Sequence, residues 1–553
     1  MSRNLQFRWL GKTSFADAEA IQNSLFSAKG KDYMLLLEHL PVYTQGIRAS
    51  QEEVLVKDLG APVVKVKRGG ATTFHGLGQL VIYPVVDLAP RSHMSTFYVN
   101  TLENLIIEVL AELGITNVGR LAQYPGVWVD PNGSNARKIA AIGTRISKGR
   151  TMHGAALNVS TDLSMFENIV PCGISDKAVT SVLAEGITTS LHEVVDLVEK
   201  KAAAFMAEVS QDSDIVISRQ DVAWKNTSIV GQKNLIPKLA SKHLTTRLNE
   251  AFSSSSEPVK WIETKRKPPW LRAKFNIGQE YKELRSTLKG FDLATVCEEA
   301  GCPNIYECWN QGTATFMING TRCTRACAFC LVDTRRPLEL DHQEPMRVAQ
   351  AVKQMNLSYV VLTAVARDDL EDGGASGFVS SIEHIRRLCP QVSIEILIPD
   401  FKSNLNSLEK IFSVAPEVLN HNLETVPRLQ RAIRPSASYA TSLAVLARAK
   451  QAGLVTKSGL ILGMGETEQE ISQSIIDLGS IGVDILTLGQ YLRPSSNHLP
   501  ISRWVEPKEF EDLKEFALGV GFSHVESSPL TRSSYHAKAA AQNASSLISI
   551  PVN

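Results

Sequence analysis

The sequence lacks the features of membrane, exported and nucleic-acid-coating proteins. No run of about 18 consecutive apolar residues occurs, so a membrane-spanning helix is not predicted. Residues 1–20 alternate polar and apolar positions without the apolar centre of a signal peptide, so export is not predicted either. The 58 Lys and Arg residues nearly balance the 57 Asp and Glu residues, and the resulting net charge of +1 argues against a protein that coats nucleic acid.

Short-period repeats and low-complexity tracts are also missing, and the composition is that of globular proteins, with 44% hydrophobic and 21% charged residues. At about 150 residues per domain, the 553 residues correspond to three or four domains, or to two larger α/β domains. Cysteine is distributed unevenly, because six of the eight cysteines lie between positions 297 and 330. In a long chain without an export signal, clustered thiols indicate metal binding in a reducing cytoplasm rather than disulfides.

Two regions with different patterns are predicted, separated by a linker. The first mixes helical stretches such as 96–113 with strand-like runs, which predicts an α/β or α+β domain. Those runs are 34–37, 63–66, 80–86 and 127–129. Periodicity then weakens and ends in a serine-rich stretch that cannot support a core. We therefore place the domains at 1–215 and 259–553, with a linker at 216–258.

The C-terminal region alternates short apolar runs with helical stretches. This order predicts parallel βα units, for which a partial or full (β/α) barrel is the simplest closure. The apolar runs are 359–363, 392–398, 418–420, 456–462 and 485–490. The helical stretches between them include 377–389, 438–452 and 469–481. The predicted fold class is thus α/β, with a mixed N-terminal domain and a barrel-like C-terminal domain.

Cys323, Cys327 and Cys330 form a compact triplet with gaps of three and two residues. A loop with this spacing can direct three thiolates toward one iron–sulfur cluster and leave one iron open for a small molecule. A zinc site is the alternative, but structural zinc sites close with four ligands and this loop contains no histidine. The spacing resembles that of the radical S-adenosylmethionine (SAM) enzymes. The resemblance implies a 4Fe–4S cluster whose open iron chelates SAM.

Two further segments are candidates for binding SAM. Asp368 and Asp369 follow the first strand after the triplet, at a strand end where barrels place their chemistry, with a solvated charged turn as the alternative. A second segment resembles the strand-end motif near the adenine in radical SAM enzymes, with an ordinary strand-to-turn glycine as the alternative. Its residues are Gly459, Ile461, Gly463 and Glu466.

Cys297, Cys302 and Cys308 form a second triplet immediately upstream. Two sets of three cysteines are unlike a ferredoxin, whose clusters are each closed by four. Together with the motifs at 267–271 and 532–537, this arrangement closely resembles the lipoyl synthases over residues 259–540. The resemblance implies an auxiliary 4Fe–4S cluster that donates sulfur and has Ser534 as its fourth ligand.

Two clusters are chemically reasonable because sulfur insertion at unactivated carbons requires removal of hydrogen from strong C–H bonds. No side-chain acid or base can do this, whereas a carbon radical derived from SAM can. The resemblance implies that a low-potential electron donor reduces the first cluster. It further implies that two SAM molecules support insertion of two sulfurs, at C6 and C8 of a protein-bound octanoyl chain.

The N-terminal region contains a glycine-rich segment around His75, followed by Lys138 and by Cys172 between a proline and a glycine. Glycines let backbone amides approach a bound acyl group. In this order the motifs, over about residues 6–214, resemble the octanoyl-[acyl carrier protein]:protein N-octanoyltransferases, which share a fold with biotin and lipoate ligases. Leu77 departs from the family, which usually has proline there, so the entropy of this loop differs.

The octanoyltransferase resemblance implies a role for each motif. Cys172 is the nucleophile that accepts the octanoyl group, and Lys138 activates the thiol and moves its proton. Considered without the resemblance, a cysteine like Cys172 is more often a buried thiol, and a lysine like Lys138 is more often a surface cation. The implied acyl pocket consists of Arg68, Gly69, Gly70, Ala71, Thr72, Thr73, Phe74, His75, Ala141, Ile142, Gly143, Gly154, Ala155 and Ala156.

The two resemblances describe consecutive steps, because the octanoylated lysine made by the first activity is the substrate of the second. We expect a bifunctional lipoate-assembly enzyme that uses two 4Fe–4S clusters and SAM. Its expected partners are octanoyl-acyl carrier protein, lipoyl domains of 2-oxoacid dehydrogenases and the glycine cleavage H protein. One alternative is a ligase-like acyl-binding domain fused to a different sulfur-inserting radical SAM enzyme. Another is a scaffold whose inactive first domain presents lipoyl domains.

Overall fold

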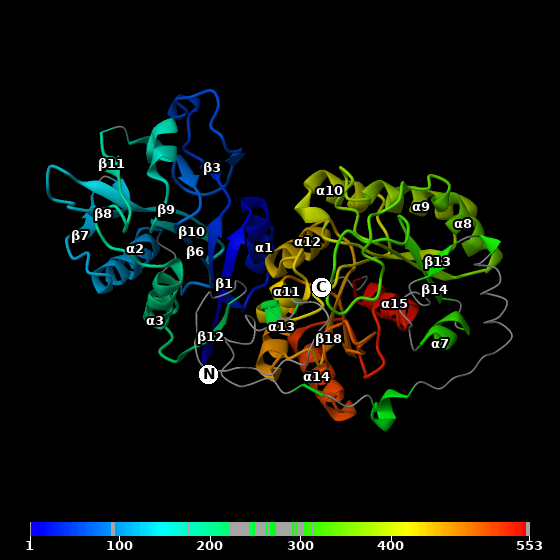
Figure 1. The fold of residues 1–553 in the computed structure, drawn as a ribbon. Helices are drawn as coiled ribbons and strands as arrows, with labels where there is room; N and C mark the ends of the chain where they lie inside the picture. Colours follow the sequence, from blue (N-terminus) through cyan, green and yellow to red (C-terminus); the bar gives the residue numbers. More distant parts are fainter. Residues whose placement is uncertain are drawn as a thin grey trace. The chain divides into compact units, whose positions relative to one another are not determined.

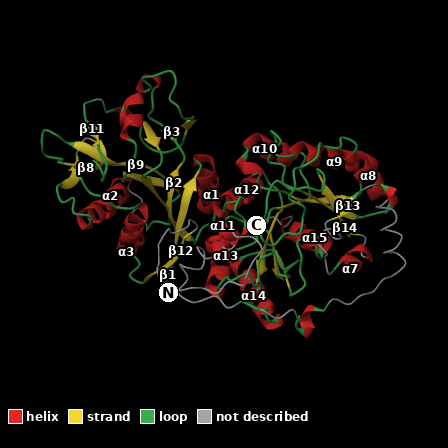
Figure 2. Ribbon diagram, in the orientation of Figure 1, coloured by secondary structure: helices red, strands yellow, loops and turns green. Residues whose placement is uncertain are grey.

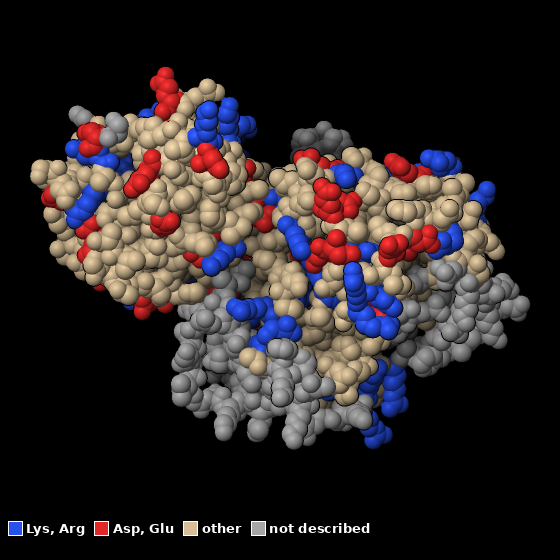
Figure 3. Space-filling view, turned by 45° about the horizontal axis from the view of Figure 1, so that its top comes forward, with Lys and Arg blue, Asp and Glu red and all other residues tan. Residues whose placement is uncertain are grey.

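The computed structural model divides the chain into two compact units, Met1–Lys225 and Asn226–Asn553 (Figure 1). The structure describes residues 2–89, 95–122, 124–174, 176–221, 244, 246–248, 261–262, 266–272, 290–291, 293–295, 304–310 and 313–548. No helix among these residues is long and apolar enough to cross a membrane. Basic and acidic side chains are interspersed on the face shown in Figure 3, in keeping with the small net charge.

The first unit is built on a mixed sheet, whose strands are drawn in yellow in Figure 2. The sheet has nine strands, in the order β12-β1-β2-β6-β10-β9-β8-β7 with β11 paired to β9. Its strands are β1 (Arg3–Thr13), β2 (Asp32–His39), β6 (Gln79–Val85), β7 (Val118–Leu121), β8 (Tyr124–Val129), β9 (Arg137–Ser147), β10 (Arg150–Asn158), β11 (Ala178–Val179) and β12 (Ile215–Asp221). A small second sheet has the order β4-β3-β5, with β3 (Val42–Gln45), β4 (Val63–Lys65) and β5 (Thr72–His75). The four strand-like runs expected from the sequence therefore fall in β2, β4, β6 and β8.

Two helices, α2 (Ser95–Glu112) and α3 (Leu191–Ser210), share one hydrophobic core with the central strands of the large sheet. Helix α1 spans Phe15–Ser27. Tyr98 and Ile106 of α2 and Val198 of α3 are buried in a single cluster with strand residues. A capping box between Ser190 and Glu193 satisfies the first backbone N–H groups of α3. Strands β9 and β10 both contribute residues to this core and to the cavity described below.

The second unit contains a sheet in the order β13-β14-β15-β16-β17-β18-β19-β20, parallel from β14 onward. Its strands are β13 (Ala294–Thr295), β14 (Thr313–Ile318), β15 (Tyr359–Ala364), β16 (Ser393–Leu397), β17 (Val418–Asn420), β18 (Thr456–Leu462), β19 (Ile485–Gln490) and β20 (His524–Ser527). The helices are α7 (Ile305–Asn310), α8 (Glu344–Gln354), α9 (Ala375–Leu388), α10 (Leu405–Ser413), α11 (Pro427–Ile433), α12 (Tyr439–Gln451), α13 (Glu468–Ser480), α14 (Pro507–Val520) and α15 (Ala537–Ile548).

Strand and helix alternate through this unit, as the sequence predicted, and the result is a partial barrel. Each of the five expected apolar runs corresponds to a strand, from β15 to β19. The helical stretches at 377–389, 438–452 and 469–481 correspond to α9, α12 and α13. The predicted α/β fold class is therefore confirmed for both halves of the chain.

A buried ion pair crosses the middle of the barrel sheet. Lys457 Nζ on β18 lies 2.9 Å from Glu395 Oε1 on β16, and the two side chains are 0% and 1% exposed. The Tyr359 hydroxyl donates a hydrogen bond to the other carboxylate oxygen at 2.9 Å. Removing one member of a buried pair leaves an uncompensated charge in a low-dielectric interior, which is costly.

Lys457→Met should therefore lower the free energy of unfolding of the barrel unit by about 3–5 kcal/mol. Urea denaturation of the full chain, followed by circular dichroism, measures this change. Lys450→Met is a matched control, because Lys450 pairs with Asp484 at 2.6 Å but is 33% exposed. We expect the control to cost less than about 1 kcal/mol. If both variants lost the same free energy of unfolding, burial would not explain the contribution of the Lys457–Glu395 pair.

Candidate active sites

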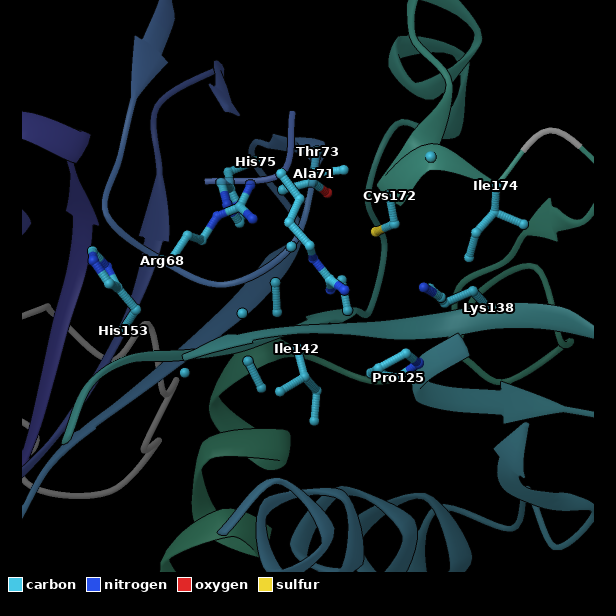
Figure 4. Close-up of a pocket in the computed structure, with 18 of the residues that line it drawn as sticks. Arg68, Ala71, Thr73, His75, Pro125, Lys138, Ile142, His153, Cys172 and Ile174 are labelled. Atoms are coloured by element: carbon cyan, nitrogen blue, oxygen red, sulfur yellow. The ribbon is translucent and has the colours of Figure 1, made fainter. Parts of the chain in front are cut away.

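A cavity of about 330 Å³ in the first unit collects most of the residues expected to bind an acyl group. Its volume lies within the range of roughly 300–1,000 Å³ that is common for small-molecule sites. We call it the N-terminal cavity (Figure 4). The predicted residues that line it are Arg68, Gly70, Ala71, Thr73, His75, Lys138, Ala141, Ile142, Gly143, Gly154, Ala155, Ala156 and Cys172.

Cys172 sits on a short 3₁₀ turn, Pro171–Gly173, at the wall of this cavity. Its backbone is left-handed, with φ at 56°, a conformation that costs free energy in a residue with a side chain. The thiol is half-buried and points into the cavity (Figure 4). A strained turn that exposes a nucleophilic atom to an enclosed space is typical of a catalytic position.

Two buried cations lie in the same cavity as the thiol. Lys138 on β9 is 6% exposed, and its Nζ lies 4.9 Å from the centre of the Trp128 ring. Arg68 is 8% exposed and donates hydrogen bonds to Thr44 and to its neighbouring backbone carbonyl. Burial lowers the pKa of Arg68, while the negative charge of a Cys172 thiolate acts in the opposite direction. Two basic side chains thus line the same cavity as the Cys172 thiol.

Glycine at position 143 lets Arg68 lie directly on strand β9. A Cβ at Gly143 would come within 2.9 Å of Arg68 Cδ and 3.0 Å of the Gly69 carbonyl oxygen. Gly69 itself donates its N–H to the Thr144 carbonyl at 2.9 Å. A larger residue at 143 would displace the loop that carries the guanidinium.

Three residues of the predicted acyl pocket lie outside the cavity. Side chains alternate along β5, so Thr73 and His75 face the cavity whereas Thr72 and Phe74 face away. Phe74 packs instead against Tyr43 and Phe166 in a separate hydrophobic cluster. The backbone N–H of Gly69 donates a hydrogen bond to Thr144 on β9.

The imidazoles at the cavity wall are uncharged at neutral pH. Burial lowers the pKa of His153 to about 4, with Arg68 adding to the effect. Burial also places the pKa of His75 well below its usual value, and its Nδ1 lies 2.7 Å from Gln79 Oε1. An uncharged wall of this kind suits an apolar acyl chain better than it suits a charged ligand.

Several lining residues were not predicted, because they belong to segments without a recognisable motif. Spacing along the chain offered no signal for them. They are Phe15, Arg48, Glu53, Tyr83, Tyr124 and Pro125.

A second cavity, of about 440 Å³, lies in the barrel unit, and we call it the barrel cavity. Cys330, Gly459 and Ile461, all predicted from the sequence, line it. Lys267 lines it as well, from the motif that precedes the cysteine triplets. The half-buried acid Glu424 was missed by the sequence reading, and burial raises the pKa of its carboxyl group. The cavity thus combines one sulfur donor with buried polar groups.

Cys323, Cys327 and Cys330 lie in one loop and are each half-buried. The loop is held by backbone hydrogen bonds, from Cys323 N to Asp333 O at 2.8 Å and from Cys330 N to Cys327 O at 3.1 Å. Burial raises the pKa of Cys330 to about 12, and negative charge on the other two thiols adds to this shift. A metal ion that binds these sulfurs must displace their protons.

The chemistry of these three residues is that of an iron–sulfur ligand set, because such clusters are held by cysteine thiolates. A structural zinc ion would need a fourth ligand. Among the residues that the structure describes, no three His, Cys, Asp or Glu side chains are arranged to hold one metal ion.

Four of the predicted SAM contacts lie outside the barrel cavity. Arg325 donates two hydrogen bonds to Asp368, each 2.8 Å long, and a third to Asp400 at 2.6 Å. Asp369 pairs with Arg367 at 2.9 Å. These carboxylates thus anchor arginines around the cysteine loop. The remaining two, Gly463 and Glu466, close the turn after β18, where the Glu466 carboxylate accepts the backbone N–H groups of Gly463 and Met464.

The residues expected to hold the auxiliary cluster are described only in part. Cys297 and Cys302 lie outside the described residues, whereas Cys308 is buried on the short helix α7. Ser534 is half-buried in the turn before α15. The next residue, Tyr535, donates its hydroxyl to Glu307 Oε2 at 3.1 Å, and so ties the serine turn to the helix of Cys308. The structure thus brings together two segments that are more than two hundred positions apart.

Known protein families match segments in both halves of the chain. Residues 12–203 match the lipoyl protein ligase A/B catalytic domain. Residues 239–302 match the N-terminal domain of lipoyl synthase, and residues 317–478 match the radical SAM superfamily. Among solved structures, a lipoate protein ligase from Thermoplasma acidophilum superposes on 40% of this chain and 87% of its own, with a TM-score of 0.32 and 18% identity. A superposition of this quality supports no conclusion about activity.

Curated relatives match the C-terminal half at much higher identity. Lipoyl synthase from Tropheryma whipplei (strain Twist) is 53% identical over 276 residues, which cover 50% of this chain and 79% of the relative. Lipoyl synthase from Rubrobacter xylanophilus is 54% identical over 273 residues, which cover 49% of this chain and 85% of the relative. The chain therefore belongs to the lipoyl synthase family, and in the same polypeptide a lipoyl protein ligase A/B catalytic domain precedes its radical SAM region.

Proposed function

We propose that this protein assembles lipoyl groups in two consecutive reactions. The first unit transfers octanoyl from acyl carrier protein to a lysine of a lipoyl domain. The second unit inserts two sulfurs at C6 and C8 of that octanoyl chain. The observation that best supports the first reaction is the meeting of Cys172 and Lys138, from separate segments, in one cavity. A ligase, which activates a free acid, has no need of a cysteine there.

In the first reaction the Cys172 thiolate attacks the carbonyl carbon of the thioester, and the carrier thiol leaves. Lys138, held close by the Trp128 ring, is placed to deliver the proton that the leaving sulfur takes up. The octanoyl chain would lie along the neutral side of the N-terminal cavity, near His75 and His153. The lysine amine then attacks the acyl-cysteine and restores the thiol.

In the second reaction Cys323, Cys327 and Cys330 would hold one 4Fe–4S cluster, and Cys297, Cys302, Cys308 and Ser534 the other. When bound, the clusters and SAM supply the electron, the carbon radical and the sulfur. The chain's own residues bind and orient SAM. Asn422 donates to Glu424 at 3.0 Å and to Ser533 at 2.7 Å, and this network aligns polar groups along the barrel cavity.

The proposed partners follow from these reactions. They are octanoyl-acyl carrier protein, lipoyl domains of 2-oxoacid dehydrogenases, the glycine cleavage H protein and a low-potential electron donor. The main competing function is an ATP-dependent ligase, because the matching family model covers lipoyl protein ligases.

One anaerobic experiment tests the proposal. The full chain is incubated with octanoyl-acyl carrier protein, apo lipoyl domain, SAM and dithionite, and the mass of the acceptor is followed over time. We expect an octanoyl adduct that forms without ATP and then converts to the lipoyl form. If octanoate with ATP is used while octanoyl carrier protein is not, the first unit is a ligase and the proposal fails.

A further inference from the structure

Charge is distributed unevenly around the N-terminal cavity. Arg48, Arg68 and Lys138 line it, and the imidazoles beside them are neutral. Glu53 is the one carboxylate among the described residues that line this cavity. If the first unit acylates a lysine, as proposed above, the acceptor arrives as a cation and must approach Cys172 past these positive charges. Like charges repel, and they do so more strongly near a protein surface than in bulk water.

Glu53 is fixed in position by its neighbours. It ends the short turn Gln51–Glu53 and is 9% exposed. One carboxylate oxygen, Oε2, accepts the backbone N–H of Thr72 at 2.7 Å. The Glu53 carbonyl accepts the N–H of Val170 at 2.7 Å, just before the turn that carries Cys172. The carboxylate is therefore tied to both the glycine-rich segment and the nucleophile's turn.

The second carboxylate oxygen is available to a ligand. Glu53 Oε1 lies 3.6 Å from the position that a Cβ on Gly173 would occupy, so it borders the residue after the nucleophile. Within the described part of the chain, this oxygen has no hydrogen bond or ion pair. The charge of Glu53 acts on Arg68, but no ion pair joins them. A carboxylate oxygen that is open beside a thiol can accept a charge-assisted hydrogen bond from a cationic ligand.

We propose that Glu53 binds the ε-ammonium group of the acceptor lysine beside the octanoyl-Cys172 thioester and orients it for attack. Loss of one ammonium proton to water gives the amine, which forms a C–N bond with the thioester carbon as the C–S bond breaks. A second proton leaves the new amide nitrogen and returns to the Cys172 sulfur. Thioester and ammonium thus become amide, thiol and one free proton, and no oxidant or reductant is needed.

The test separates the two halves of the transfer reaction. The variant Glu53→Gln keeps an oxygen that can accept the Thr72 N–H but removes the charge. Acylation of Cys172 by octanoyl carrier protein is followed by mass in the absence of acceptor. The acyl-enzyme is then mixed with apo lipoyl domain, or with hydroxylamine, which is a neutral nucleophile at pH 7. Glu52→Gln, which alters the exposed neighbour in the same turn, is the matched control.

We expect Glu53→Gln to acylate Cys172 within about twofold of the unchanged protein and to react equally fast with hydroxylamine. Transfer to the lipoyl-domain lysine should fall at least about tenfold and recover partly at alkaline pH, where more of the lysine, with a pKa of about 10.4, is neutral. Glu52→Gln should behave as the unchanged protein.

Two outcomes would contradict the role of Glu53, and a third would contradict the octanoyltransferase function. Undiminished lysine transfer by Glu53→Gln overturns the role of Glu53. Equal slowing with lysine and hydroxylamine also overturns it, because a structural defect would affect both nucleophiles. Failure of the unchanged protein to form any acyl-enzyme overturns the proposed octanoyltransferase function instead, so the two failures are distinguishable.

Discussion

Cys172→Ala should abolish octanoyl transfer while leaving sulfur insertion intact. Without the thiol, no acyl-enzyme can form in the N-terminal cavity, and loss of a catalytic nucleophile typically costs at least about a thousandfold in rate. The barrel unit has its own core and cavity, so it should still convert a lipoyl domain that already carries octanoyl. Mass spectrometry of the acceptor, with octanoyl carrier protein or with pre-octanoylated domain, measures the two activities separately.

Cys389→Ala is the control for this substitution. Cys389 follows helix α9 and is likewise a half-buried free thiol, but it lies far along the chain from the first unit. We expect both activities to remain near those of the unchanged protein. If Cys172→Ala transferred octanoyl at the normal rate, Cys172 would not be the nucleophile and the first unit would need another mechanism.

The second large effect concerns the division of work between the two cysteine triplets. Changing Cys323, Cys327 and Cys330 to Ala should abolish the cleavage of SAM, and with it every later step. Changing Cys297, Cys302 and Cys308 to Ala should preserve SAM cleavage and abolish lipoyl formation. The reason is that the first triplet borders the barrel cavity through Cys330, whereas Cys308 lies on α7 beside the Ser534 turn.

Two measurements check this division. Release of 5′-deoxyadenosine reports SAM cleavage, and acceptor mass reports sulfur insertion. Iron and sulfide content is an independent readout, because each triple variant should keep about half of both if it loses one of two four-iron clusters. Loss of 5′-deoxyadenosine in a folded variant of the upstream triplet would contradict the division. So would complete loss of iron in either variant.

Sequence reasoning succeeded where the information is local. The run 359–363 lies within β15, because a buried parallel strand is mostly apolar. The triplet Cys323, Cys327 and Cys330 was predicted from spacing alone, and the structure places its three half-buried thiols in one loop. Cys172 and Lys138 came from motifs whose order along the chain is distinctive, and both line the N-terminal cavity.

The face of a strand was harder to predict. Every residue of the segment 68–75 was assigned to the acyl pocket, but only alternate residues of β5 face it. Thr72 and Phe74 face away because Phe74 fills a cluster with Tyr43 and Phe166. That side chains alternate along the strand is predictable. Which alternate set faces the cavity depends on what packs against each side of the strand.

The sequence by itself determined the strand and helix order of the barrel, because that order depends on residues near one another in the chain. Only the tertiary structure decided which charges meet. It paired Asp368 with Arg325, tied Tyr535 to Glu307 and set Glu53 beside the turn of Cys172. These contacts join distant segments, and packing of the whole core fixes them rather than any local spacing.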